Sequence, residues 1–260
     1  MENAVDKQND LNAADMAEKI KALVRPGERV DDLQCGGFLL IQNPEHFCFG
    51  TDAVLLANFA SGRKSAKAVD LGTGTGIIPV LMLAKDKARE FTALEIQEEM
   101  AEMAGRSAEL NSISERMHVV KGDIKDVKNL FPHDSFDIVT SNPPYIVYGG
   151  GYHNPEEKVN IARHEILVRL EDVVSAASYL LKGGGRFAMV HKPFRLGEII
   201  YYMQKYKIEP KRMQLVQPKE GCEANMVLIE GVKSAKSGLK VLPTINVYNA
   251  DGSHIDYGKL

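Results

Sequence analysis

Four consecutive residues, Asn142-Pro143-Pro144-Tyr145, could together activate a weakly nucleophilic amino group. The two prolines lack a backbone N–H and hold the chain in an extended, rigid turn. The side-chain oxygen of Asn142 and the carbonyl oxygen of Pro143 could accept both hydrogens of an aromatic amine. These two hydrogen bonds favour tetrahedral geometry at the nitrogen, in which its lone pair can attack. We therefore predict that the four residues form a catalytic loop.

The remaining chemistry of this loop would be positioning. The Tyr145 ring could stack on a base such as adenine, which must leave its own stack to be reached. No strong base is needed at the start, because the amino proton becomes acidic once a group has been transferred. Catalysis would then consist mainly of aligning the two reactants.

A second motif, Asp70-Leu71-Gly72-Thr73-Gly74-Thr75-Gly76, predicts a site for a positively charged cofactor. Its glycines permit a sharp turn and close approach of a ligand. Their spacing differs from the dinucleotide pattern G-x-G-x-x-G, and no lysine follows as in a phosphate-binding loop. Asp70 would repel a pyrophosphate but suits an ammonium group. S-adenosylmethionine carries an ammonium and a sulfonium, so we predict that it is the cofactor.

Two further acids end the next two predicted strands. Glu95 lies 19 residues after Gly76 and could accept hydrogen bonds from both ribose hydroxyls. Asp123 could accept one from an adenine amino group. The glycine turn could in principle serve packing alone. Acids at the ends of three neighbouring strands favour a cofactor site instead. Together with Asn142, the predicted cofactor site comprises Asp70, Gly72, Thr73, Gly74, Gly76, Glu95, Ile96 and Asp123.

The segments that carry these motifs alternate between strands and helices. Strands are expected over 66–72, 90–96, 116–123, 135–142 and 184–191, and helices over 76–85, 97–111, 165–181 and 195–206. This alternation predicts a parallel sheet with helices on both faces. Strands 211–218 and 225–233 follow without a helix and should be antiparallel. We therefore predict an α/β, doubly wound, seven-stranded Rossmann-like sheet with an antiparallel final strand, the methyltransferase arrangement.

Three parts are expected along the chain. Residues 1–27 form an N-terminal extension that is helical or disordered. Residues 28–233 form the methyltransferase domain, which opens with short strands and a helix over 51–59. Thr51 would be the N-cap of that helix, and Asp52 would lie in its first turn. Residues 234–260 form a tail with a possible hairpin around Ala250-Asp251-Gly252.

The composition fits a globular protein of 260 residues, 44% of them hydrophobic, with a net charge of −3. No apolar run reaches the roughly 18 residues of a membrane span, and the acidic N-terminus lacks a secretory signal. We therefore expect a cytoplasmic protein without a membrane partner. Its three cysteines and seven histidines show no metal-ligand spacing, so no metal is predicted. Nothing in the sequence indicates an oligomeric state.

Positive charge is concentrated in one segment. Residues 182–219 hold nine Lys or Arg against two acids, and three tyrosines lie among them. Such a cluster can contact phosphates and stack on bases, although a solvated helix face and core tyrosines would explain it as well. Lys192 and Arg195, beside the end of strand 184–191, are the best candidates for phosphate contacts. Arg163 is a further candidate for an RNA contact.

On these motifs, the sequence resembles the N-P-P-Y amino-methyltransferases. More closely, it resembles the bacterial family that methylates adenine N6 beside the anticodon of valine tRNA. The resemblance covers about residues 28–233. Besides the two loops it rests on residues 28–33, 49–56, 162–165 and 191–196. It implies that tRNA is the partner, that adenine 37 is the target, and that Thr51 and Asp52 lie near the methionine end of the cofactor.

Alternative substrates share the same loop. Release-factor glutamine N5-methyltransferases also use N-P-P-Y, but they usually carry a helical domain before the glycine loop, where this chain has only about 65 residues. A DNA enzyme would need a recognition domain, and no insertion is large enough. A non-catalytic module that binds S-adenosylmethionine or RNA is disfavoured because no expected motif residue is missing.

Overall fold

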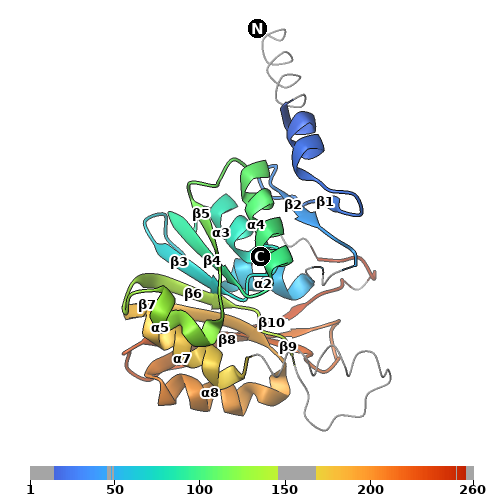
Figure 1. Ribbon diagram of the computed structural model, residues 1–260. Helices are drawn as coiled ribbons and strands as arrows, with labels where there is room; N and C mark the ends of the chain where they lie inside the picture. The colour runs from blue at the N-terminus through green and yellow to red at the C-terminus, as the bar shows by residue number, and fades with distance from the viewer. Residues whose placement is uncertain (1–14, 46–47, 49, 146–167, 250, 256–260) are drawn as a thin grey trace, which may run out of the picture.

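The computed structural model describes residues 15–45, 48, 50–145, 168–249 and 251–255. Its centre is a sheet of eight strands in the order β10-β8-β9-β7-β6-β3-β4-β5, with helices on both sides (Figure 1). The strands are β3 (Lys67–Leu71), β4 (Glu90–Glu95), β5 (Met117–Lys121), β6 (Phe136–Ser141), β7 (Leu181–His191), β8 (Ile208–Gln217), β9 (Met226–Lys233) and β10 (Lys240–Asn246).

Five neighbouring strands of this sheet run in the same direction. β3 pairs in parallel with β4 and β6, β4 with β5, and β6 with β7. β9 lies between β7 and β8 and is antiparallel to both. Parallel neighbours need a crossover connection, whereas β8 and β9 are joined by a short loop and can only be antiparallel. The predicted doubly wound class and its antiparallel final strand are confirmed.

The predicted number of seven strands is wrong by one. β10, from the predicted tail, pairs in parallel with β8 at the margin of the sheet. Most residues of β10 are exposed or half-buried. A strand at a sheet margin needs no continuous apolar run, so its sequence lacks the signal of a buried strand. After β10, an isolated antiparallel bridge joins Tyr248 to His254.

Helices cover both faces of the sheet. α2 (Thr51–Phe59), α3 (Ile77–Ala84) and α4 (Glu98–Leu110) pack on one face, and α5 (Val127–Leu130), α7 (Leu170–Leu180) and α8 (Leu196–Lys205) on the other (Figure 1). Consecutive strand residues point to opposite faces. In β3, Ala68 therefore joins the core under the first group of helices, and Val69 the core under the second.

One predicted N-cap and one predicted helix start are wrong. α2 spans the expected residues, but Gly50, not Thr51, is its N-cap. α7 begins at Leu170 rather than at residue 165, because Arg169 is extended and its N–H donates to the Asp172 carboxylate at 3.0 Å. The short helices η1 (Ile124–Asp126) and α5, which connect β5 to β6, were not predicted.

The N-terminal segment packs against α4. Residues 15–23 are helical, and β1 (Arg29–Asp32) and β2 (Leu39–Gln42) then form a separate antiparallel ribbon. Apolar side chains of the first helix, Met16 and Ile20 among them, belong to a small core with Met103 and Leu110. Among the described residues, no helix is long and apolar enough to cross a membrane.

Gly76, at the start of α3, has a backbone conformation that disfavours any side chain, and the end of Met117 would have to move to make room for one. Its φ is +86°, and a Cβ would lie 2.6 Å from Met117 Cε. We expect Gly76→Ala to lower the free energy of unfolding by about 1–3 kcal/mol, because the new methyl group would be both strained and overpacked. Urea unfolding without ligands measures this.

Gly105→Ala in the middle of α4 is the matched control. A Cβ at Gly105 would meet nothing within 4 Å. Alanine should therefore stabilise this helix by about 0.5–1 kcal/mol. Equal effects of the two substitutions would contradict the packing argument.

Candidate active site

The two predicted motifs meet at one edge of the sheet. β3 leads into the glycine loop, β4 ends at Glu95, and β6 ends at Ser141, directly before Asn142. Because these strands are parallel neighbours, their carboxyl ends lie side by side. We call this side of the sheet the carboxyl edge. It brings the predicted cofactor loop and the predicted catalytic loop together.

The glycine loop adopts a backbone conformation that requires glycine at three positions. Gly72, Gly74 and Gly76 have φ angles of +73°, +57° and +86°. The N–H groups of Gly72 and Thr73 both donate to the Leu94 carbonyl, at 2.9 and 3.0 Å. A Cβ at Gly74 would meet nothing within 4 Å. The loop is therefore held against β4 and leaves open space where a ligand can approach its main chain.

Glu95 connects the glycine loop to the end of β4. Its carboxylate is buried and accepts from Gly74 N–H at 2.8 Å and from Gln97 N–H at 2.9 Å. Each oxygen keeps a further lone pair for a ligand hydroxyl. The next residue, Ile96, is 36% exposed. After β5, Asp123 is half-buried and accepts from Lys125 N–H at 2.9 Å, as the N-cap of η1.

Asp70 is a fully buried carboxyl at the start of the glycine loop. Its Oδ1 accepts from the Thr140 hydroxyl at 2.6 Å, whereas Oδ2 has no hydrogen-bond partner among the described residues. Burial raises the pKa of Asp70 to about 6, although the Thr140 hydrogen bond opposes this. A buried acceptor without a partner calls for a donor from outside the chain. The ammonium group of S-adenosylmethionine fits this requirement.

The side chain of Asn142 is oriented by Asp52 from the first turn of α2. Asn142 Nδ2 donates to Asp52 Oδ2 at 3.1 Å. A carboxylate can only accept, so the amide must turn its NH₂ group to Asp52 and leave Oδ1 as the acceptor. The Tyr145 hydroxyl lies 3.0 Å from Asp52 Oδ2 and 2.5 Å from Asn142 Oδ1, and its one hydrogen can be donated to either. Pro143 is buried and Pro144 is exposed.

Sequence analysis expected Asp52 to lie near the cofactor and did not foresee its contact with the catalytic loop. The contact joins residues 90 positions apart, which no local pattern can reveal. Thr51 is half-buried beside it, as the first residue of α2.

His191, which sequence analysis did not select, supports the Tyr145 ring. The two rings lie 5.3 Å apart at 70°, and Lys192 Nζ is 5.0 Å from the Tyr145 ring centre. Burial and the charge of Arg195 lower the pKa of His191 to about 4, so its imidazole is neutral near pH 7. Burial and Asp52 raise the pKa of Tyr145, whose hydroxyl therefore stays protonated. The sequence signals for His191 were its place at a strand end and its place in segment 191–196, which carries part of the family resemblance.

Many cations of segment 182–219 are held by ion pairs within the fold. Arg186 and Arg212 bind the fully buried Glu230 at 2.9 and 3.0 Å, and Lys182 binds Asp137 at 3.1 Å. Arg195 binds Glu198 at 2.6 Å. The local charge excess therefore overstates what is available to phosphates. Lys192 follows the last residue of β7, and its ammonium lies 5.0 Å from the Tyr145 ring centre. Arg163 lies outside the described residues.

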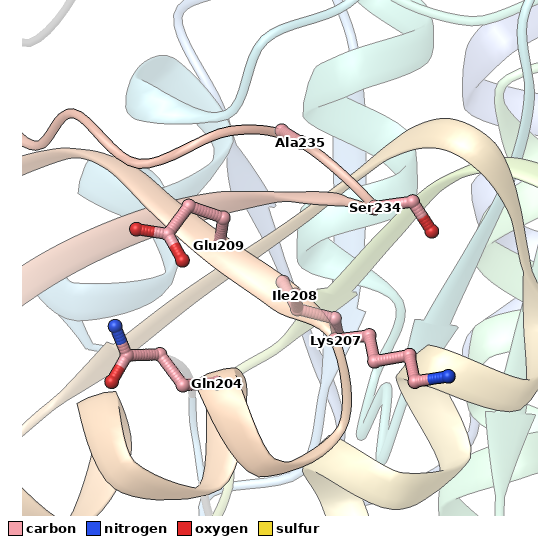
Figure 2. A pocket seen from close by; sticks show the side chains of 6 residues that line it. All are labelled: Gln204, Lys207, Ile208, Glu209, Ser234 and Ala235. Carbon is pink, nitrogen blue, oxygen red and sulfur yellow. The ribbon is translucent and has the colours of Figure 1, made fainter.

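A hollow elsewhere on the surface is unrelated to this site. It measures about 320 Å³ and is lined by Gln204, Lys207, Ile208, Glu209, Ser234 and Ala235 (Figure 2). It lies where β8 begins and β9 has ended, which is the edge of the sheet opposite to the glycine loop. The described residues also contain no cluster of His, Cys, Asp and Glu that could hold a metal ion.

Comparison with known proteins decides the family. Residues 45–205, more than half of the chain, match the model of the methyltransferase small domain. The chain belongs to this family. It is 31% identical over 187 residues to a Porphyromonas gingivalis protein named tRNA1(Val) (adenine(37)-N6)-methyltransferase. The aligned segment covers 70% of this chain and 72% of that relative.

Solved structures agree with this family. A predicted O-methyltransferase from Agrobacterium tumefaciens is similar with a TM-score of 0.62 and 27% identity, over 78% of this chain and 90% of that one. Geranyl diphosphate C-methyltransferase from Streptomyces coelicolor, solved with S-adenosyl-L-homocysteine, shares the fold with a TM-score of 0.52 and 16% identity, over 70% and 74%. The predicted fold, enzyme class and S-adenosylmethionine cofactor are confirmed for this methyltransferase.

The buried Asp70 predicts a pH dependence of stability. Its pKa rises from the ordinary 3.8 to about 6 on folding, so in this window the native state holds a proton that the unfolded chain releases. The wild type should therefore lose stability relative to Asp70→Asn as the pH rises from about 4 to about 7. Urea unfolding of both proteins across this range, without cofactor, measures the difference. A constant difference would show that Asp70 is not perturbed by burial.

Proposed function

We propose that this chain methylates N6 of an adenine in tRNA, with adenine 37 of valine tRNA as the target. The observation that carries the proposal is the Asn142 amide, turned by Asp52 so that its oxygen is an acceptor, beside a glycine loop suited to a cationic cofactor. The name of the Porphyromonas gingivalis relative supports the choice of substrate. A tRNA substrate would make this a cytoplasmic enzyme.

The cofactor would be held by the residues predicted from the sequence. Asp70 Oδ2 would accept from its ammonium group, Glu95 from its ribose hydroxyls and Asp123 from its adenine. The exposed Ile96 would pack on the adenine face, while Thr51 and Thr73 would border the methionine end. When bound, S-adenosylmethionine supplies a methyl group on a positively charged sulfur, which an amine can take up.

The catalytic loop would prepare the adenine amine. Asn142 Oδ1 and the Pro143 carbonyl would each accept one amino hydrogen, which favours the tetrahedral geometry of the nitrogen. Asp52 keeps the Asn142 amide in the required orientation and prevents the NH₂ group from facing the amine. The Tyr145 ring, supported by His191, would stack on the base. Tyr145 and His191 would not exchange protons near neutral pH, because the pKa of each lies far from 7.

Methyl transfer from labelled S-adenosylmethionine tests this function directly. Purified wild-type enzyme is offered unmodified valine tRNA, release factor and single-stranded DNA in separate reactions. We expect label in tRNA as N6-methyladenosine. Label only on release-factor glutamine, or only in DNA, would retain the loop chemistry but refute the tRNA substrate.

Asn142→Ala should separate chemistry from cofactor binding. We expect kcat to fall at least about 100-fold, because an oriented acceptor of the amine is lost, while the Kd for S-adenosylmethionine changes by less than about threefold. Single-turnover kinetics and calorimetry measure the two effects. Tyr145→Phe is the milder comparison, since it keeps the ring and removes only the hydroxyl. An Asn142→Ala enzyme with nearly normal kcat would refute the proposed mechanism.

Lys192→Ala should weaken tRNA binding more than cofactor binding. Loss of one phosphate contact should raise KM for tRNA. In a plot of the logarithm of the tRNA binding constant against the logarithm of the salt concentration, the negative slope should become shallower by about 1. Lys182→Ala, whose parent side chain pairs with Asp137 away from the carboxyl edge, is the matched control and should leave the slope unchanged. Equal slopes for wild type and Lys192→Ala would show that Lys192 makes no phosphate contact.

A further inference from the structure

Phe194 is the most exposed large hydrophobic residue among those that the structure describes. Its side chain is 64% exposed, ahead of Val241 and Tyr201 at 62% and 60%. A single exposed hydrophobic side chain is common on a protein surface, but an aromatic ring close to a nucleic-acid site offers a flat face on which a base can stack. Sequence analysis included Phe194 in segment 191–196, which carries part of the resemblance, but proposed nucleic-acid contacts only for Lys192 and Arg195 in that segment.

The backbone holds Phe194 in a defined position. It is the middle residue of the 3-10 helix η2 (Pro193–Arg195), which joins β7 to α8. Pro193 restricts the backbone before it, and Arg195 N–H donates to the Lys192 carbonyl at 3.1 Å after it. The Arg195 side chain is in turn bound to Glu198 by two hydrogen bonds of 2.6 Å. Little backbone freedom would be lost when a ligand covers the ring.

Phe194 also lies near the proposed position of the target base. It follows His191, whose ring touches Tyr145, by three residues, so the two Cα atoms are at most about 11 Å apart. Lys192, between them in the chain, places its ammonium 5.0 Å from the Tyr145 ring centre. A cation therefore lies at the ring on which the adenine would stack, and the exposed Phe194 follows that cation two residues later in the chain.

We propose that Phe194 stacks on a nucleotide that flanks the target adenine, while Lys192 contacts the phosphate between them. Aromatic rings next to cations are how proteins hold single-stranded nucleic acid, because every base has a flat face. A stacked neighbour would keep the strand splayed, so that the adenine can turn toward Asn142. This inference rests on the proposed tRNA substrate and adds the residue that positions the strand.

Other exposed hydrophobic side chains are worse placed for this role. Tyr201 lies seven residues further along, about 10 Å down the axis of α8, and its ring packs on Tyr202 at 5.3 Å. Val241 belongs to β10, which is separated from β7 by β8 and β9. Val241 therefore provides a control of equal exposure at a remote place.

The experiment compares Phe194→Ala, Phe194→Leu and Phe194→Tyr with Val241→Ala in the full-length enzyme. The probe is an unmodified anticodon stem-loop of valine tRNA, with KM and kcat from methyl transfer and Kd from fluorescence anisotropy. Loss of one stacked base should raise KM and Kd about 5- to 150-fold in Phe194→Ala. Phe194→Leu should be similarly weak because it lacks a flat ring, whereas Phe194→Tyr should bind within about threefold of wild type. The Kd for S-adenosylmethionine should not change in any variant.

Three outcomes would overturn the inference. The first is wild-type affinity of Phe194→Ala for the stem-loop, and the second is an equal loss in Val241→Ala. The third is full activity of Phe194→Leu, which would show apolar contact without stacking. Thermal unfolding of each variant checks that the fold is intact. A wild-type enzyme that does not methylate the stem-loop would instead refute the proposed function itself, so the two failures are distinguishable.

Discussion

Asp52 accepts a hydrogen bond from the Asn142 amide and lies within reach of the Tyr145 hydroxyl, and the arrangement of loop 142–145 depends on this contact. An asparagine amide can bind an amine usefully only if its oxygen faces it. Both ends of the amide have nearly the same shape, so packing alone cannot select the orientation. A carboxylate selects it by charge, since it accepts from NH₂ and repels the carbonyl oxygen.

The same site shows how the fold tolerates buried acids. Asp70 is fully buried and has one oxygen without a partner, while Glu95 accepts from Gly74 N–H of the glycine loop with one oxygen and from Gln97 N–H with the other. The Asp70 carboxylate is unfavourable without a cation beside it, as its raised pKa indicates. A cationic ligand removes that penalty. The site therefore gains affinity for such a ligand from a group that lowers the stability of the free protein.

The carboxyl edge also determines which residues can reach a nucleic acid. β7 leads from its buried strand through His191 to Lys192 and Phe194, so the support of the Tyr145 ring and the proposed contacts to RNA come from one short stretch. Other positively charged residues of segment 182–219 form ion pairs that stabilise the fold. Arg186 and Arg212 neutralise the buried Glu230, which would otherwise be an uncompensated charge inside the sheet.

The sequence by itself determined the doubly wound class and predicted the glycine loop, the acids at three strand ends and the N-P-P-Y loop, because each of these rests on a local pattern of residues. Asp70, Glu95 and Asn142 each lie at or directly beside the end of a strand of recognisable pattern, and parallel neighbours end at one edge. Only the tertiary structure decided the partners across long separations: Asp52 with Asn142, His191 with Tyr145, and Glu230 with its two arginines. It also decided that β10 joins the sheet and that Phe194 remains exposed. Burial and pairing depend on which distant segments pack together, and local residue patterns do not encode that choice.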